Sequence, residues 1–262
     1  PVTFQPAAVA IGQANLTSAV MGNPATASNL TGILGPSGNA AVNGATLYVS
    51  DSYRNRILGF AALPTASGAN ADFVLGQASF TTGASGVSAT ALNQPTSLQV
   101  SGGKLFVADS GNSRVLVFGA APTTSGAAAD LAVGQADLTS KVQACTATGL
   151  RGAQGVAAGG TKLVVADTIN NRILVWDGIP TARGAAASLV LGQPDFTHCT
   201  DRGAAGIYQP TGVWTDGTRL LVADEDGNRV LVWTTFPTAN DEAPDFVLGQ
   251  PDLTQKAPVD PP

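Results

Sequence analysis

The chain has 262 residues, of which 44% are hydrophobic and 12% are charged, and its formal net charge is −5. Such a chain can bury a large core, so general disorder is excluded, and its length suits one large all-β domain or two small ones. It has no cluster of basic residues and no apolar run of about 18 residues, so we expect no nucleic-acid partner and no membrane insertion.

The first regular feature is a Gly-Gln segment, VAIGQ at residues 9–13, which is typical of a short strand. After an irregular stretch, an Asn-Gly turn at 43–44 predicts a two-residue hairpin. An apolar run then ends at Asp51, and a second run begins at Arg56 after a short turn. A loop rich in Pro, Ala and Gly leads to a last strand, FVLGQ at 73–77. This unit predicts four short antiparallel strands.

The same unit occurs four times, which is the most informative feature of the sequence. The aspartates stand at 51, 109, 167 and 224, so the steps are 58, 58 and 57 residues, and the arginines keep these steps. The units cover about 18–77, 78–135, 136–193 and 194–254 of one domain, 1–262. Repeated four-stranded antiparallel units form β-propellers. We therefore expect an all-β β-propeller with four blades of four antiparallel strands each, and one surplus Gly-Gln strand at the N-terminus.

The second unit contains LFVADSGNSRVLVF at 105–118: an apolar strand, Asp, a short turn with Asn, Arg, and a second apolar strand. This arrangement resembles the NHL-repeat family of β-propellers, and the resemblance extends from about residue 11 to 254. It implies a ring of four blades, fewer than the family usually has, built from units that are longer than usual.

Each Asp–Arg pair flanks the turn between two strands. We expect the carboxylate to accept backbone N–H groups in that turn and the guanidinium to donate across it, with Asn112 supplying left-handed geometry. A ring of carboxylates around a cation is the alternative. The expected turn network consists of Asp51, Arg56, Asp109, Arg114, Asp167, Arg172, Asp224 and Arg229.

Catalytic and metal-binding chemistry finds little support in the sequence. The stretch ADEDGN at 223–228 resembles a calcium loop but lacks the Glu that should follow. His198 is the only histidine, so the several histidines and the metal of lyases in related propellers cannot be carried over. No serine lies on a nucleophile elbow. We expect no catalytic residue, no metal and no cofactor, and rank a lyase or hydrolase third.

The two cysteines, Cys145 and Cys199, lie in equivalent loops after the Gly-Gln strands of successive units. A propeller brings such loops side by side, so we expect a disulfide, with two free thiols as the alternative. A disulfide indicates an oxidising compartment. The sequence opens without a secretory leader, which fits a cytosolic protein or a mature or trimmed form. The uncharged polar composition favours the latter, and we expect a secreted or periplasmic protein.

Strand direction places the Asp–Arg turns and the loops after Gly-Gln on one face and the Pro/Ala/Gly loops on the other. Binding residues are usually carried by loops. The candidates for a ligand or partner face are Arg151, Asp201, Arg202, Tyr208 and Trp214. Tyr208 and Trp214 occur in the fourth unit alone and are candidates for an aromatic pair facing a ligand. We expect a non-catalytic scaffold for protein–protein interaction or self-assembly, with a carbohydrate- or small-ligand-binding module as the alternative.

The Gly-Gln element has five copies, one more than four blades need. The copy at 9–13 precedes the first unit, and the copy at 246–250 ends the last. Three explanations remain open: the surplus strand packs on its own molecule, it completes a blade of a neighbouring molecule, or the chain is a piece of a longer array.

Overall fold

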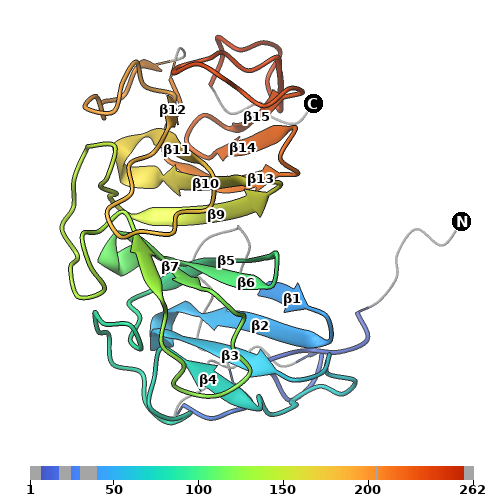
Figure 1. Cartoon of the computed structure of the whole chain (residues 1–262). Coiled ribbons are helices and arrows are strands. Elements are labelled where there is room, and N and C mark those ends of the chain that lie inside the picture. The colour runs from blue at the N-terminus through green and yellow to red at the C-terminus, as the bar shows by residue number, and fades with distance from the viewer. Residues whose placement is uncertain (1–6, 18–24, 30–39, 204–205, 257–262) are drawn as a thin grey trace, which may run out of the picture.

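The computed structural model describes residues 7–17, 25–29, 40–203 and 206–256. Its strands form four sheets, each of four antiparallel strands that pair in chain order (Figure 1). We call these sheets blades 1 to 4. Within the described ranges, no helix has the length and apolar character needed to cross a membrane.

The blades have the following strands. Blade 1 contains β1 (Ala40–Asn43), β2 (Thr46–Asp51), β3 (Arg56–Phe60) and β4 (Phe73–Leu75). Blade 2 contains β5 (Pro95–Ser101), β6 (Lys104–Asp109), β7 (Arg114–Phe118) and β8 (Leu131–Val133). Blade 3 contains β9 (Ala153–Gly159), β10 (Lys162–Asp167), β11 (Arg172–Asp177) and β12 (Leu189–Leu191). Blade 4 contains β13 (Pro210–Thr215), β14 (Leu220–Asp224), β15 (Arg229–Trp233) and β16 (Phe246–Leu248).

Turn residues set the ends of these strands. In blade 2, Gly102 and Gly103 have φ of +56° and +72° and close a two-residue hairpin between Ser101 and Lys104. Positive φ at both positions suits the right-handed twist of the paired strands. Short 3-10 turns follow the aspartates of blades 1 to 3, at η1 (Ser52–Arg54), η2 (Ser110–Asn112) and η3 (Thr168–Asn170).

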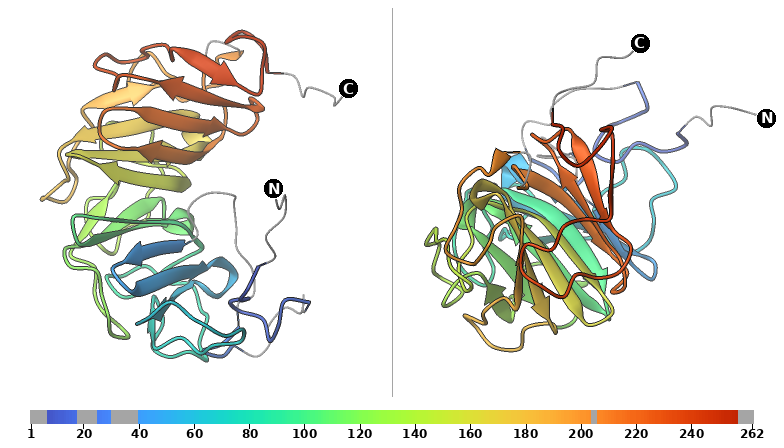
Figure 2. Two further views of the ribbon diagram at one scale, coloured as in Figure 1. Left: turned by 90° about the vertical axis from the view of Figure 1, so that its right-hand side faces the viewer. Right: turned by 90° about the horizontal axis from the view of Figure 1, so that it is seen from above.

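The four blades follow one another along an arc, with blade 1 at one end and blade 4 at the other (Figure 2). Their first strands are neighbours in the order β1, β5, β9, β13. The expected blades of a β-propeller are therefore present. The ring implied by the family resemblance is not closed, because the outer faces of blades 1 and 4 do not meet.

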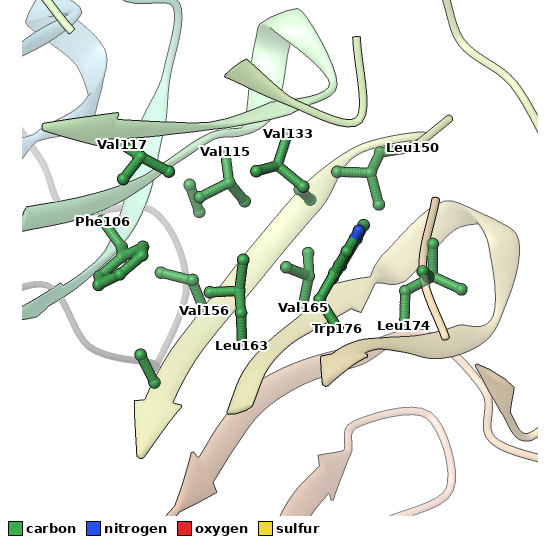
Figure 3. Packing of buried hydrophobic residues seen from close by; sticks show 14 of the residues in the cluster. Phe106, Val115, Val117, Val133, Leu150, Val156, Leu163, Val165, Leu174 and Trp176 are labelled. Atoms are coloured by element: carbon green, nitrogen blue, oxygen red, sulfur yellow. The ribbon is translucent and has the colours of Figure 1, made fainter. Parts of the chain in front are cut away.

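Apolar side chains fill the spaces between blades. Between blades 2 and 3, Phe106 and Val117 approach Val156 and Leu163, and Trp176 at the end of β11 is buried in the same cluster (Figure 3). Burial of one such side chain contributes roughly 1.5–3 kcal/mol. Since each blade has apolar residues on both faces, it is fully sheltered only when it has a neighbour on each side.

Candidate interaction surface

The Asp–Arg pairs are ion pairs inside the blades. In each pair the arginine Nε donates to the aspartate Oδ2 at 2.7–2.8 Å, and both side chains are buried. Arg114 also donates from its Nη atoms to the carbonyl oxygens of Leu138, Ser88 and Ala91. Leu138 lies in the loop after blade 2, whereas Ser88 and Ala91 lie in the loop before it. The arginine therefore ties both long loops to the hairpin of its blade.

The carboxylates differ from expectation in one respect. Asp109 Oδ1 accepts the N–H of Asn93 at 2.7 Å, from the incoming loop sixteen residues earlier instead of from its own turn. The turn satisfies itself, because Ser113 N–H donates to the Ser110 carbonyl. Ser113, at φ +51°, is the left-handed residue. Asn112 instead donates its side-chain amide to Asp109 Oδ2 at 2.8 Å.

Burial has an electrostatic cost at these sites. It raises the pKa of Asp109, and raises the pKa of Asp167 to about 6, although the neighbouring arginine acts in the opposite direction. Loss of hydration thus outweighs attraction within the pair, so the pair fixes the loops in place more than it adds net stability. Each carboxylate faces its own arginine, and the four carboxylates do not gather into one cluster in the described part of the chain.

The structure joins Cys145 and Cys199 in a disulfide, with their Cα atoms 6.2 Å apart. Cys145 precedes β9 and Cys199 precedes β13, so the bond links the loops after blades 2 and 3. Arg172 lies beside it, with Nη1 3.9 Å from the Cys145 sulfur. In the chain-entropy model, closing a loop of this length contributes about 4 kcal/mol.

Loop residues that were expected on one face have separate roles. Arg151 and Tyr208 donate their backbone N–H groups to Asp167 and Asp224. Asp201 is exposed and accepts the N–H of Gly203 at 2.8 Å. These contacts order the loops.

Arg202 turns to the outer edge of the molecule. It pairs with both carboxylate oxygens of Asp241 at 2.6 Å. Asp241 belongs to the loop between β15 and β16, which was expected on the opposite face. That loop is long enough to fold back over blade 3, where the Asp241 N–H donates to the Val190 carbonyl. The two sets of loops therefore meet at the outer edge.

Tyr208 and Trp214 do not form an aromatic pair. Tyr208 precedes β13 and has the Lys256 ammonium 5.6 Å from its ring centre. Trp214 lies near the other end of β13, with the Arg219 guanidinium 5.7 Å from its ring centre. The extended stretch from Pro210 to Trp214 alone spans roughly 13 Å.

Trp214 belongs to an apolar surface on blade 4 that the sequence did not reveal. Register pairs Trp214 with Leu221, Leu221 with Val232, and Val232 with Phe246, so the four form one row across the sheet. A second row of smaller residues lies beside it. We call this surface the tail face; it comprises Trp214, Leu221, Ala223, Val230, Val232, Phe246 and Leu248.

The tail face is exposed where its counterparts are covered. Trp214, Phe246 and Leu248 are 47%, 43% and 52% exposed. In blade 3, the corresponding Ala157, Leu189 and Leu191 are buried, and the two leucines pack in one cluster with residues of blade 4. The exposure thus comes from position at the end of the arc, because the residues at these places are apolar in both blades.

A cavity of about 420 Å³ lies between blades 3 and 4. Ile207, Leu231, Trp233 and Leu253 supply its apolar lining, and Arg229 borders it. None of the five residues expected on the ligand face lines it. Its volume falls within the range of small-molecule sites.

Comparison with known proteins finds one matching family model and several solved structures of low similarity. Residues 92–118, from the start of blade 2 to the end of β7, match the family model for the NHL repeat. A search of curated proteins finds no match to the sequence.

Solved structures with some similarity to this chain include a β-propeller domain. The WD40 β-propeller domain of Doa1 has a TM-score of 0.45 and 8% identity, over 74% of this chain and 49% of that one. A streptogramin B lyase has a TM-score of 0.44 and 12% identity, over 82% of this chain and 54% of that one. The computationally designed Ika4 protein has a TM-score of 0.43 and 13% identity, over 78% and 94%. This chain spans about half the length of the first two.

Proposed function

We propose that this protein is a non-catalytic scaffold that binds other proteins outside the cytoplasm. The observation that supports it is the tail face, where Trp214, Phe246 and Leu248 stand exposed on a regular sheet. Contiguous apolar patches of this kind are typical of protein-binding surfaces, and aromatic side chains are enriched among the residues that dominate binding energy.

The absence of catalysis in this proposal is supported by the surroundings of His198. The side chain is exposed, and its Nδ1 lies 2.8 Å from the Asp195 carboxylate in the same loop. The backbone N–H groups of Thr197 and His198 also donate to that carboxylate. The pair closes a local turn, and in the described part of the chain no three potential metal ligands gather.

The scaffold proposal is tested by capturing partners from the extracytoplasmic fraction of the source organism. The immobilised protein should retain a specific protein, and the double variant Phe246→Asp, Leu248→Asp should lose it. Val142→Asp changes an exposed apolar residue in a distant loop and is the matched control. If both variants retain the same proteins as the unaltered chain, the tail face is not the binding surface.

The proposed location outside the cytoplasm is supported by the disulfide. Protein taken directly from its native compartment should react with a thiol-alkylating reagent only after reduction, at both Cys145 and Cys199. Labelling of both cysteines before reduction would place the protein in a reducing compartment and refute this part of the proposal.

A second candidate function, binding of a small ligand, is favoured by the cavity beside Trp233. A bound ligand should raise Tm and alter the fluorescence of Trp233. Leu253→Phe, which copies the residue that blade 3 has at this position (Phe196), should fill the cavity and abolish both effects. Screening sugars and small apolar compounds without any shift in Tm would reject this candidate.

A further inference from the structure

The N-terminal Gly-Gln segment, residues 9–13, has the local structure of an outermost blade strand without being in a sheet. Gly12 has φ of +82°, and the glycines that follow β4, β8, β12 and β16 have φ of +81° to +88°. Asn15 Oδ1 then accepts the N–H of Thr17 at 3.0 Å, as Asp137 Oδ1 does for Thr139 in blade 2. The segment and its following turn therefore repeat the end of a blade.

This segment also occupies the position of such a strand beside blade 1. Between blades 1 and 2, Val74 N–H donates to Ser125 Oγ at 3.0 Å and Gly126 N–H donates to the Val74 carbonyl. At the start of the arc, Ala10 N–H donates to Ser67 Oγ at 2.9 Å and Gly68 N–H donates to the Ala10 carbonyl. Ala10 stands three residues before Gln13, just as Val74 stands three before Gln77. Ala10 thus takes the place that Val74 has at a junction between blades.

Apolar contacts extend this match. The outer face of blade 1, which we call the head face, comprises Leu47, Val49, Leu58, Phe60 and Val74. Ile11 packs against this cluster and covers part of it. Val42, at the inner edge of blade 1, stays 49% exposed. The segment therefore caps the outer part of the head face, where the outermost strand of a preceding blade would lie.

At the other end of the arc, β16 has the same features at its outer edge. Val247 stands three residues before Gln250, in the position of Val74, and its edge carries no loop from a following blade in the described part of the chain. The tail face beside it is exposed. The described arc thus presents one half of a blade junction on blade 4 and the other half on blade 1, where residues 9–13 fill the place of the missing strand.

From this complementarity we infer that the tail face binds the head face of a second copy of this chain, in exchange for residues 9–13. The inference rests on the proposed function, because it names the partner of the tail face. In the junction, β16 of one copy forms hydrogen bonds with Ser67 and Gly68 of the other copy. Trp214 of the first copy approaches the inner edge of blade 1 in the other copy, near Val42. Residues 9–13 and β16 compete for one position, so the cap holds the protein as a monomer until it is displaced. Two arcs joined at both ends form a ring of eight blades, within the usual range of propellers.

The test measures molar mass by light scattering over a range of concentrations, using the full chain with its disulfide intact. Ala10→Pro removes the N–H that binds Ser67, and Ile11→Asp removes the apolar contact with the head face. Either substitution should lower the concentration needed for self-association by at least about tenfold. Leu16→Asp, in the same segment at a 54% exposed position, is the matched control and should behave like the unaltered chain.

A second set of variants establishes which faces meet. Adding Leu248→Asp to Ala10→Pro should return the mass to the monomer value of 26.2 kDa. Mixing this double variant, which has a free head, with the unaltered chain, which has a free tail, should restore a pair of one copy of each. Near-ultraviolet circular dichroism from the buried Trp176 and Trp233 verifies that each variant is folded.

Three outcomes would overturn the inference. They are uncapped variants that are folded and stay monomeric, association that survives Leu248→Asp, and a mixture that forms no pair. If copies do not associate but the tail face still captures a different protein, the proposed scaffold function stands and the inference about its partner fails. If the copies do not associate and the tail face captures no other protein, the proposed scaffold function fails as well.

Discussion

At the scale of single residues, the repeated Asp and Arg act as connectors between distant parts of the chain. Arg172 bonds to Asp167, to Phe196 after blade 3, and to Thr146 and Gly149 before it. A guanidinium can serve so many acceptors because it presents five N–H donors in a planar fork. The repeat of these two residues therefore repeats a whole loop arrangement.

Removing one member of such a pair should destabilise the folded protein. Asp109→Asn leaves Arg114 as a buried cation without its counter-charge, and we expect a loss of about 3–5 kcal/mol in the free energy of unfolding. Asp177→Asn makes the same chemical change in the exposed pair with Lys162 and should cost less than about 1 kcal/mol. Denaturant unfolding with the disulfide intact measures both. Equal losses for the two substitutions would contradict the connecting role of Asp109.

The turns after β8, β12 and β16, which have an aspartate two residues after the glutamine, should show a distinctive acid titration. Hydrogen bonds from the backbone and side chain of Thr139 lower the pKa of the exposed Asp137 to about 2. An Asp in the unfolded chain has a pKa of about 3.9. The turn is therefore stabilised above that pH and loses this stabilisation as the pH falls towards 2. Following the Asp137 carboxyl carbon by NMR should give the lowered midpoint, and Thr139→Val should move it upward. A midpoint near 3.9 in the unaltered protein would show that these bonds do not form.

At the scale of strands, side-chain size is matched across each blade. Gly59 on β3 lies opposite Phe73 on β4, and a Cβ atom at Gly59 would overlap the Phe73 ring. The equivalent pairs are Val117 with Leu131 and Val175 with Leu189. Blade 4 instead pairs Val232 with Phe246, and this aromatic ring is exposed. The buried ring of Phe73 thus has a glycine partner, whereas the smaller leucines at this place in blades 2 and 3 have a valine partner.

This matching predicts a compensating pair of substitutions. Gly59→Val should destabilise the protein by about 1–3 kcal/mol, because the added methyl groups displace Phe73. Adding Phe73→Leu recreates the pair that blades 2 and 3 use and should recover most of the loss. A double-mutant cycle in denaturant measures the coupling between the two sites. Additive losses would mean that the two side chains do not compete for the same space.

At the scale of the whole molecule, the blades form a one-dimensional stack with unlike ends. In such stacks, stability is approximately a sum over units and the junctions between them. Blade 3 has a junction on both sides, whereas blade 4 has one, and the tail face remains open.

We therefore expect stability to fall towards the C-terminal end of the arc. Amide hydrogens of β14 and β15 should exchange faster than those of β10 and β11, because fewer apolar contacts oppose opening of blade 4. Exchange measured by mass spectrometry at a concentration where the protein is monomeric compares the two hairpins directly. Equal protection of both hairpins would show that the tail face is covered in the monomer.

The sequence by itself determined the local structure of this protein. The regular spacing of Asp and Arg predicted four units, the Asn-Gly and Gly-Gly turns predicted the hairpins, and the positions of Cys145 and Cys199 predicted their disulfide. These features depend on backbone conformation and on contacts within one unit or between neighbouring units. The residues that specify them therefore recur in the sequences of the units.

Only the tertiary structure decided what the ends of the stack do. Leu189 and Phe246 occupy equivalent places in similar strands, yet one is buried and the other is exposed. Likewise, residues 9–13 have the sequence of a blade strand but lie outside every sheet, against blade 1. Burial depends on whether another blade lies alongside, and that is a property of position in the arc which no single unit of sequence encodes.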